Sequence, residues 1–420
     1  MRKYLVGGAV RNKILGLPVK DKDWVVVGST PDFFIKNKYK QVGKKFPVFL
    51  HPITNEEYAL ARTEKKCGVG YKGFEVNYSP YIKLKEDLIR RDITINAIAQ
   101  DKFGKYFDPC NGLLDIKKRL LRHISPSFSD DPLRVFRVAR FAALLFHLGF
   151  KICSNTLSLM SSKFLKNEIK HLEIERIWQE TEKAFRTKNP NIYLQVLFDC
   201  NLISTIFPEI YYLFGLNNKF NYFNKKKFYK QNIFQGLSYI SKYTNRVDIK
   251  FSFFLQLFNI NLICCVTNKR KNYFFKHFLK YIYNFLNRIK APKKVKNLSL
   301  VFIKNINLLI NISNISSTEI VILLKKMNAW RNPKIIKKIS LLMNCYINFL
   351  NIFSKKNKHK GIFYSQYLKN VFKVASTVSF SSISVEIKNG MYIQKELDRL
   401  KKLAIDRWKT FNTVNCFKNC

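Results

Sequence analysis

The chain has 420 residues and a formal net charge of +47, because its 75 lysine and arginine residues far outnumber its 28 aspartate and glutamate residues. This length accommodates about two to four domains with cores of their own, and this charge indicates a polyanionic partner, nucleic acid or an anionic membrane surface, bound more weakly as salt rises. Apolar stretches such as residues 300–315 are interrupted by Lys304 and by several asparagines, so we expect no membrane-spanning segment.

The first predicted elements are a short strand, Lys3 to Val6, and a helix, Ala9 to Leu15, joined by the pair Gly7-Gly8. Glycine allows a ligand to approach the backbone closely, and the first N–H groups of a helix attract phosphate oxygens. Arg11 lies one turn into this helix, where its guanidinium can hold a triphosphate with two hydrogen bonds. A tight turn with a surface arginine is the alternative, since the segment matches neither a Walker loop nor a dinucleotide-binding glycine pattern.

A second predicted strand carries Asp21 and Asp23 and continues to Val27. Side chains alternate across a strand, so both carboxylates project from one face. Mg²⁺ is usually held by one or two carboxylates together with substrate phosphates, so this pair favours nucleotidyl transfer. A D-x-D pattern alone is more often a solvated strand edge or turn. Glu57, on a third predicted strand from Glu57 to Arg62, is a candidate third acid of the metal site or an ordinary strand-edge glutamate.

After a fourth predicted strand, Ile93 to Gln100, the pattern becomes helical. Asp131-Pro132 is typical of a helix start and Gly149 of a helix end, and apolar residues recur at helical spacing further along the chain. The predicted helices cover residues 132–148, 173–186, 192–202 and 392–408, while we interpret 217–232 as a linker and 355–360 as a basic break.

Four motifs follow one another in the first half of the chain: GGAVRN from residue 7, DKDWVVVG from residue 21, RRDITINAIA from residue 90 and DPLRVFRVARF from residue 131. Together they resemble the motifs of the bacterial class II tRNA nucleotidyltransferases, the CCA-adding enzymes. Each motif is modest alone, but four in the same order over roughly residues 1–215 are specific. The resemblance implies an α+β fold class: a polymerase-β-like head, built as a mixed sheet with helices, followed by an all-α neck, body and tail.

The resemblance also implies a division into domains. We expect residues 1–130 to form the catalytic nucleotidyltransferase head, residues 131–215 a helical neck and body with a nucleobase-recognition helix, and residues 216–420 a basic helical body and tail that binds tRNA. Residues 228–330 resemble the metal-dependent phosphohydrolase domain, built on a His-Asp pair, that some members carry. None of the six histidines of this chain precedes an aspartate, and Gln256-Leu257 follows the segment that approaches the pair. A glutamine and a leucine do not replace these metal ligands, so we predict that phosphohydrolase activity is absent.

The activity implied is addition of the 3′-terminal CCA to tRNA without a nucleic-acid template. The 3′-hydroxyl of tRNA attacks the α-phosphorus of CTP or ATP and pyrophosphate leaves, while Asp21 and Asp23 act as catalytic metal ligands for Mg²⁺. Family positions that contact the incoming nucleotide match Gly8, Arg11, Arg91, Arg137 and Arg140. For the last two arginines, a basic helix that is solvated or binds RNA is the alternative.

Asp131 and Arg134 match the pair that this family uses as a protein template for the base. A carboxylate accepts from an exocyclic amine and a guanidinium donates to ring nitrogens or carbonyls, so the pair fits cytosine and adenine and refuses uracil. Helix capping by Asp131 is the alternative role, and we favour both because a carboxylate has two oxygens.

Two other functions share part of this evidence. One alternative is a poly(A) polymerase of the same family, which has the same head. The other is a catalytically inactive RNA-binding protein, which would explain why the C-terminal half departs from the family pattern. Nine cysteines without zinc-ligand spacing fit a reduced compartment, and the early first strand leaves no room for a signal peptide, so we expect a cytoplasmic protein. The oligomeric state is not indicated.

Overall fold

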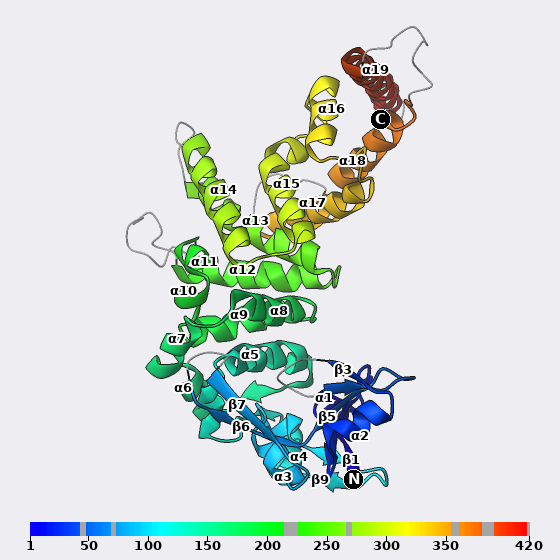
Figure 1. Ribbon diagram of the computed structural model, residues 1–420. Helices are drawn as coiled ribbons and strands as arrows, with labels where there is room; N and C mark the ends of the chain where they lie inside the picture. Colours follow the sequence, from blue (N-terminus) through cyan, green and yellow to red (C-terminus); the bar gives the residue numbers. More distant parts are fainter. Residues whose placement is uncertain are drawn as a thin grey trace. The chain divides into compact units, whose positions relative to one another are not determined.

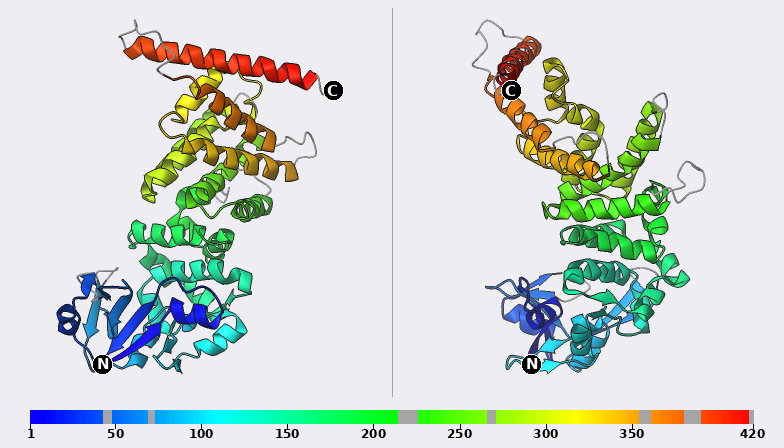
Figure 2. Two further views of the ribbon diagram at one scale, coloured as in Figure 1. Left: turned by 90° about the vertical axis from the view of Figure 1, so that its right-hand side faces the viewer. Right: turned by 180° about the vertical axis from the view of Figure 1, so that it is seen from behind.

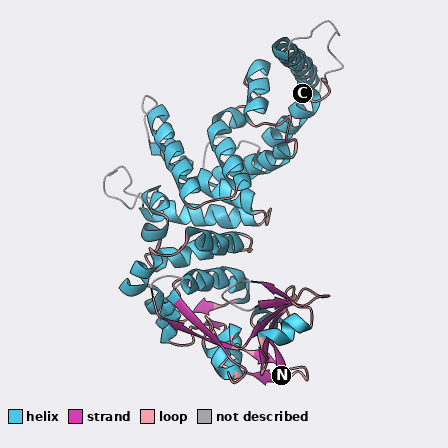
Figure 3. Cartoon of the chain, viewed as in Figure 1, coloured by secondary structure: helices cyan, strands magenta, loops and turns pink. Residues whose placement is uncertain are grey.

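The computed structural model describes residues 1–42, 48–68, 73–213, 226–265, 271–353, 361–379 and 390–417 (Figure 1). They belong to two compact units, Met1–Asn217 and Asn218–Cys420. All the described strands lie in the first unit, and the described elements of the second unit are helices (Figure 3). A mixed sheet with helices, followed by a mostly helical remainder, is the α+β architecture expected from the sequence.

A mixed seven-stranded sheet forms the centre of the first unit, in the order β3-β4-β5-β2-β1-β8-β9. Strands β2 and β5 are parallel, and the other neighbours are antiparallel. Two small sheets pair β6 with β7 and β10 with β11. The strands are β1 (Arg2–Val6), β2 (Asp23–Val27), β3 (Lys40–Val42), β4 (Val48–Leu50), β5 (Glu57–Leu60), β6 (Arg62–Lys66), β7 (Phe74–Tyr78), β8 (Ala99–Gln100), β9 (Tyr106–Phe107), β10 (Leu120–Leu121) and β11 (Lys151–Ile152).

Apolar side chains cover both faces of this sheet. Val25 packs into a cluster with Tyr4 and Leu88, whereas its neighbour Val26 packs on the other face with Phe34. This alternation is the period of two that a strand imposes. Burial on both faces fixes the register of β2, and with it the position of the carboxylate at its first residue.

Helices of the first unit follow the apolar pattern of the sequence. The predicted helix over residues 132–148 is confirmed as α5 and a 3₁₀ turn, Phe146–Leu148, which ends at Gly149 with φ 82°. Helix α5 packs against α8 and α9 (Figure 1). The helices are α1 (Gly8–Ile14), α2 (Pro31–Lys36), α3 (Leu84–Ile89), α4 (Gly112–Lys118), α5 (Leu133–Leu145), α6 (Ser154–Met160), α7 (Lys163–Ile169), α8 (Ile174–Phe185), α9 (Pro190–Asp199), α10 (Ile203–Ile206) and α11 (Pro208–Leu213).

Three strand predictions are wrong in part. Over residues 93–100 only Ala99 and Gln100 form a strand, and Thr94–Asn96 form a 3₁₀ turn. The side chains of Thr94 and Asn96 hydrogen-bond to Asp115 and Asp92 and so stabilise the turn. The strand expected to carry both Asp21 and Asp23 begins at Asp23. The alternation of side chains along a strand therefore does not determine the direction of the Asp21 side chain. The strand expected to end at residue 62 stops at residue 60, and residue 62 starts β6.

The second unit is built from α12 (Lys226–Ser241), α13 (Val247–Cys265), α14 (Lys271–Arg288), α15 (Lys293–Ile310), α16 (Ser317–Lys326), α17 (Lys334–Phe353), α18 (Gly361–Ala375) and α19 (Gly390–Phe417). Helix α13 packs against α12, α14, α15 and α17, and α19 packs against α16 and α18 (Figure 2). Residues 226–232, expected in a linker, belong to α12, and the last helix is longer than expected. The basic break at 355–360 and the rest of the expected linker, 217–225, lie outside the described residues. None of the helices described is both long and apolar enough to cross a bilayer.

Candidate active site

A cavity of about 670 Å³ in the first unit brings the sequence motifs together. Its walls come from the turn between β1 and α1, the starts of β2 and β5, the segment after α3, and helices α5 and α8. Every site residue singled out from the sequence lines it: Gly8, Arg11, Asp21, Asp23, Glu57, Arg91, Asp131, Arg134, Arg137 and Arg140. Segments more than 100 residues apart in the chain therefore contribute to one polar cavity.

Three carboxylates line one side of the cavity. Asp23 is the first residue of β2, and sheet register places it opposite Val6 on β1 and Glu57 on β5. Burial, and then the charge of Asp21, raises the pKa of Asp23, although Arg91 opposes this rise. Burial also raises the pKa of Glu57, with Asp23 and Asp21 adding to it. Burial therefore disfavours the charged form of both carboxylates, their mutual repulsion adds to this, and a bound cation would favour the charged form.

The donor set of this corner suits a hard divalent cation. Oxygen ligands are what Mg²⁺ prefers, and one or two carboxylates are usual when phosphate oxygens complete the coordination. Within the described segments, no three or more His, Cys, Asp or Glu side chains are already arranged to hold a metal ion. The chain thus offers part of a coordination shell.

The turn between β1 and α1 requires glycine. Gly7 has φ 69°, which side chains disfavour. A Cβ atom there would lie 3.3 Å from Nη1 of Arg91 and 3.8 Å from Oδ2 of Asp23. The backbone of the turn therefore lies close to the guanidinium group of Arg91 and the carboxylate of Asp23.

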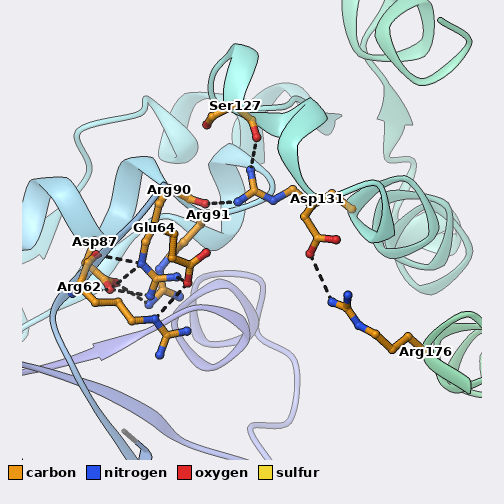
Figure 4. A network of polar contacts seen from close by, with 9 residues as sticks. Arg62, Glu64, Asp87, Arg90, Arg91, Ser127, Asp131 and Arg176 are labelled. Atoms are coloured by element: carbon orange, nitrogen blue, oxygen red, sulfur yellow. Dashed lines mark hydrogen bonds and ion pairs between the residues drawn. The ribbon is translucent and has the colours of Figure 1, made fainter. Parts of the chain in front are cut away.

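A network of ion pairs holds the two adjacent arginines of the third motif (Figure 4). The buried carboxylate of Asp87 accepts from Arg90 at 2.6 Å and from Arg91 at 3.0 Å. Burial alone would raise the pKa of Asp87, but the two arginines lower it. Arg90 also donates to Glu64 at 2.8 Å, which accepts from Arg62 at 3.0 Å. Nε of Arg91 is buried without a hydrogen-bond partner in the described part of the chain, which leaves a donor available in the cavity wall.

Asp92 and Asn96 link the third motif to the turn and to α5. Oδ2 of Asp92 accepts from Nε of Arg137 at 2.7 Å, and Oδ1 accepts from the amide of Asn96 at 3.1 Å. Asn96 in turn accepts from Nη1 of Arg11 at 2.8 Å. Burial would raise the pKa of Asp92, but Arg137 and the hydrogen bonds hold it well below its usual range. Sequence reasoning missed both residues, although polar side chains four apart in an apolar run are a signal of such a network.

The first turn of α5 fixes the pair Asp131 and Arg134. Oδ1 of Asp131 accepts from the backbone N–H of Leu133 at 3.1 Å, although the N-cap position of α5 is Pro132 and not Asp131 as the sequence suggested. Its other oxygen faces Arg176 of α8 at 3.4 Å, a residue that sequence reasoning did not single out. Arg134 donates to the backbone oxygen of Ser127 at 3.0 Å and to that of Arg90 at 2.6 Å (Figure 4). Both side chains are held in place at the cavity wall.

Known proteins resemble the whole chain. Residues 3–122 match the family described as the poly A polymerase head domain, and residues 149–213 match the family "Probable RNA and SrmB- binding site of polymerase A". The CCA-adding enzyme of Buchnera aphidicola subsp. Baizongia pistaciae is 44% identical over 430 residues, which cover 100% of each chain. The CCA-adding enzyme of the subspecies Acyrthosiphon pisum (strain Tuc7) is 44% identical over 418 residues, covering 99% of this chain and 100% of that one.

Solved structures share the fold. The CCA-adding enzyme of Bacillus stearothermophilus in complex with CTP has a TM-score of 0.61 at 20% identity, over 100% of this chain and 95% of that one. A complex of a CCA-adding enzyme with ATP has a TM-score of 0.61 at 21% identity, over 100% and 90%. The Thermotoga maritima CCA-adding enzyme complexed with tRNA has a TM-score of 0.58 at 19% identity, over 96% and 87%.

Proposed function

The chain belongs to the CCA-adding enzymes, a family of tRNA nucleotidyltransferases, and from this premise we propose that the cavity of the first unit is its active centre. The protein adds CCA to the 3′ end of tRNA from CTP and ATP. The observation that carries the assignment to this cavity is the convergence of the motif residues on one set of walls.

Arginines hold the incoming nucleotide. Arg91, with its unpartnered buried Nε, and Arg11, next to the turn, supply donors for phosphate and ribose oxygens. Arg137 and Arg140 add positive charge from α5, and the backbone at Gly8 allows close approach. Triphosphate and ribose are common to CTP and ATP, so these residues serve both substrates. Positioning the α-phosphorus for the tRNA hydroxyl is the main catalytic task of such a site.

Asp21 and Asp23 would hold Mg²⁺, and Glu57 lies on the neighbouring strand as a further acid. Nucleotidyltransferases of this polymerase type generally use a divalent metal. When bound, the metal supplies charge neutralisation for the reacting phosphate and the leaving pyrophosphate. The assignment is supported by the register that sets Asp23 beside Glu57, and by burial and repulsion, which disfavour the charged form of these two side chains unless a cation is bound.

Asp131 and Arg134 read the base. The carboxylate is the acceptor for an exocyclic amine, and the guanidinium donates to the ring nitrogen or carbonyl beside it. Adenine and cytosine both present such an amine, whereas uracil presents a carbonyl oxygen. The backbone contacts of Arg134 limit its rotation, which favours a fixed reading geometry.

We assign the remaining parts of the chain by the same reasoning. Residues 1–130 form the catalytic head, 131–215 the neck and body, and 216–420 a basic body and tail that binds tRNA. The segment 228–330, which resembles the phosphohydrolase domain, lacks phosphohydrolase activity, because Gln256 and Leu257 stand where the His-Asp pair is expected and neither residue replaces these metal ligands. Gln256 donates instead to the hydroxyl of Tyr346 at 3.1 Å. The enzyme acts in the cytoplasm. Hydrolysis of 2′,3′-cyclic AMP that a chelator abolishes would contradict the loss of phosphohydrolase activity.

Extension of labelled tRNA that lacks its terminal triplet tests the function. We expect two added nucleotides with CTP alone, none with ATP alone and three with both. Repeated addition from ATP with no use of CTP would instead identify a poly(A) polymerase. No extension under any condition, with tRNA still bound, would identify an inactive RNA-binding protein.

A further inference from the structure

Three guanidinium groups surround one aromatic ring at the cavity wall. The centre of the Phe141 ring lies 4.0 Å from the guanidinium carbon of Arg140, 5.2 Å from that of Arg11 and 5.8 Å from that of Arg137. An aromatic face attracts a cation within about 6 Å of its centre, so all three are within range. Phe141 is 5% exposed and lines the cavity itself.

The three guanidinium groups are not equally neutralised. Arg137 pairs with Asp92 at 2.7 Å and Arg140 pairs with Glu180 at 2.5 Å. Arg11, which is 3% exposed, donates only to the side-chain amides of Asn12 and Asn96 among the described residues. Burial lowers the pKa of Arg11 to about 10, and the charges of Arg140 and Arg137 add to this, while Asp92 partly opposes it. The cluster therefore has one positive charge in excess, which suits a polyanion.

Like charges at such short range repel, so something must keep the three groups together before the nucleotide arrives. A leucine or methionine at the same place would fill the volume without attracting cations. An aromatic ring fills the volume and also presents a negative face to the charges. Phe141 therefore attracts all three groups, including Arg11, whose described side-chain hydrogen bonds go to amide oxygens and not to either carboxylate.

We propose that Phe141 is a positioning residue for the incoming nucleotide, holding Arg11, Arg137 and Arg140 around its ring so that they bind the triphosphate of CTP and of ATP alike. The inference rests on the proposed function, in which these arginines contact the nucleotide. It goes further by naming the side chain that organises them and by predicting an effect on both nucleotides that leaves the choice of base unchanged.

Helix α5 offers a matched control for packing. Phe136 is 0% exposed, lies five residues earlier, does not line the cavity and has no ring–cation contact in the described structure. Phe136→Leu therefore removes a buried ring of equal size without touching the cluster. Phe141→Leu removes ring and cation attraction together, and Phe141→Tyr keeps the ring.

The experiment measures KM and kcat of the full chain for CTP and for ATP, with tRNA ending in the appropriate partial triplet, beside thermal melting of each variant. We expect Phe141→Leu to raise KM for both nucleotides by about tenfold, with kcat changed by less than about threefold. Phe141→Tyr should remain within about twofold of wild type. Phe136→Leu should lower the melting temperature and leave both KM values unchanged.

The inference is overturned if Phe141→Leu raises KM no more than Phe136→Leu does, or if Phe141→Tyr is as impaired as Phe141→Leu. It is also overturned if only one of the two nucleotides is affected. Phe141→Met, a second ringless variant, replaces Phe141→Leu should the latter not fold. Failure of wild type to add CCA would contradict the proposed function instead; direct binding of ATP by wild type and the variants then decides the role of the ring separately.

Discussion

The buried polar groups of the two units have different roles. In the first unit, buried Arg11, Asp92 and Arg134 line the cavity, and the charges around it are not fully neutralised. In the second unit, buried Ser252 and Gln256 on α13 hydrogen-bond to α15 and α17 amid aromatic side chains. Residual charge in a fold costs stability unless a ligand compensates it. The first unit thus trades stability for binding, whereas these two hydrogen bonds of the second unit are structural.

Asp23→Asn should have the largest effect on activity of the substitutions considered for the two units. We expect kcat/KM for CTP to fall by roughly a thousandfold, because a ligand of the catalytic cation is lost. Stability should rise or stay unchanged. Because the pKa of folded Asp23 is raised, the folded state binds this proton more tightly than the unfolded state, so ionised Asp23 disfavours folding at pH 7. Primer extension and thermal melting without metal measure both effects.

A matched control for this variant is Asp32→Asn, an exposed aspartate on α2 outside the cavity. Its activity and melting temperature should equal those of wild type. By the same linkage, metal-free wild type should gain stability as the pH falls toward the pKa of Asp23, and Asp23→Asn should lack this gain. A large loss of stability in Asp23→Asn at pH 7 would contradict the view that the corner is strained by its own charge.

Arg134→Ala should reduce the preference for CTP over UTP by roughly ten- to a hundredfold, since a lost base contact changes discrimination by about 1–3 kcal/mol. Misincorporation of UTP into tRNA that lacks its triplet measures this. Arg186→Ala, at an exposed position at the end of α8, is the control and should keep wild-type discrimination. Equal losses of CTP and UTP use would assign Arg134 a structural role.

Asp92→Asn should raise KM for both nucleotides by about tenfold, because Arg137 loses its counter-ion and its fixed position. The free energy of unfolding should fall by about 2 kcal/mol, less than for a fully buried pair because 38% of the Arg137 side chain is exposed. The lowered pKa of Asp92 means that its stabilisation is present above the ordinary aspartate pKa and is lost as the pH falls through the folded value. The stability gap between variant and wild type should therefore narrow below about pH 4.

Gln256→Leu should have the smallest effect. One hydrogen bond to Tyr346 is lost, but the buried Oε1, which has no partner among the described residues, is removed with it. The free energy of unfolding should change by no more than about 1 kcal/mol. CCA addition should be unaffected, and a loss of activity at unchanged stability would show that the second unit's polar interior also serves catalysis.

The sequence predicts much of the head because its signals are local. Glycine at positions 7 and 149 marks the turn and the end of α5, and the Asp-Pro pair marks the start of that helix. The four motifs contain every predicted site residue except Glu57, and the fold brings all of them to one cavity. Strand register, which places residue 57 beside residue 23, could not be predicted because it depends on pairing between distant segments.

Other features escaped prediction for physical reasons. The run from residue 93 to 100 is apolar enough for a strand, but side-chain hydrogen bonds from Thr94 and Asn96 favour a turn. The partners Asp87 and Glu180 stand in ordinary helical patterns, and only the fold reveals that they neutralise arginines of the cavity. Long-range ion pairs leave no periodic signal in a sequence.

The pair of Asp92 and Arg137 has a consequence for how this gene can change. Replacing either partner alone leaves the other charge without its counter-ion. A change that keeps the protein stable would therefore need both residues to be substituted together. Lysine and asparagine codons on solvent-facing helices carry no such constraint. The cavity should therefore tolerate fewer single substitutions than the exposed faces of the helices do.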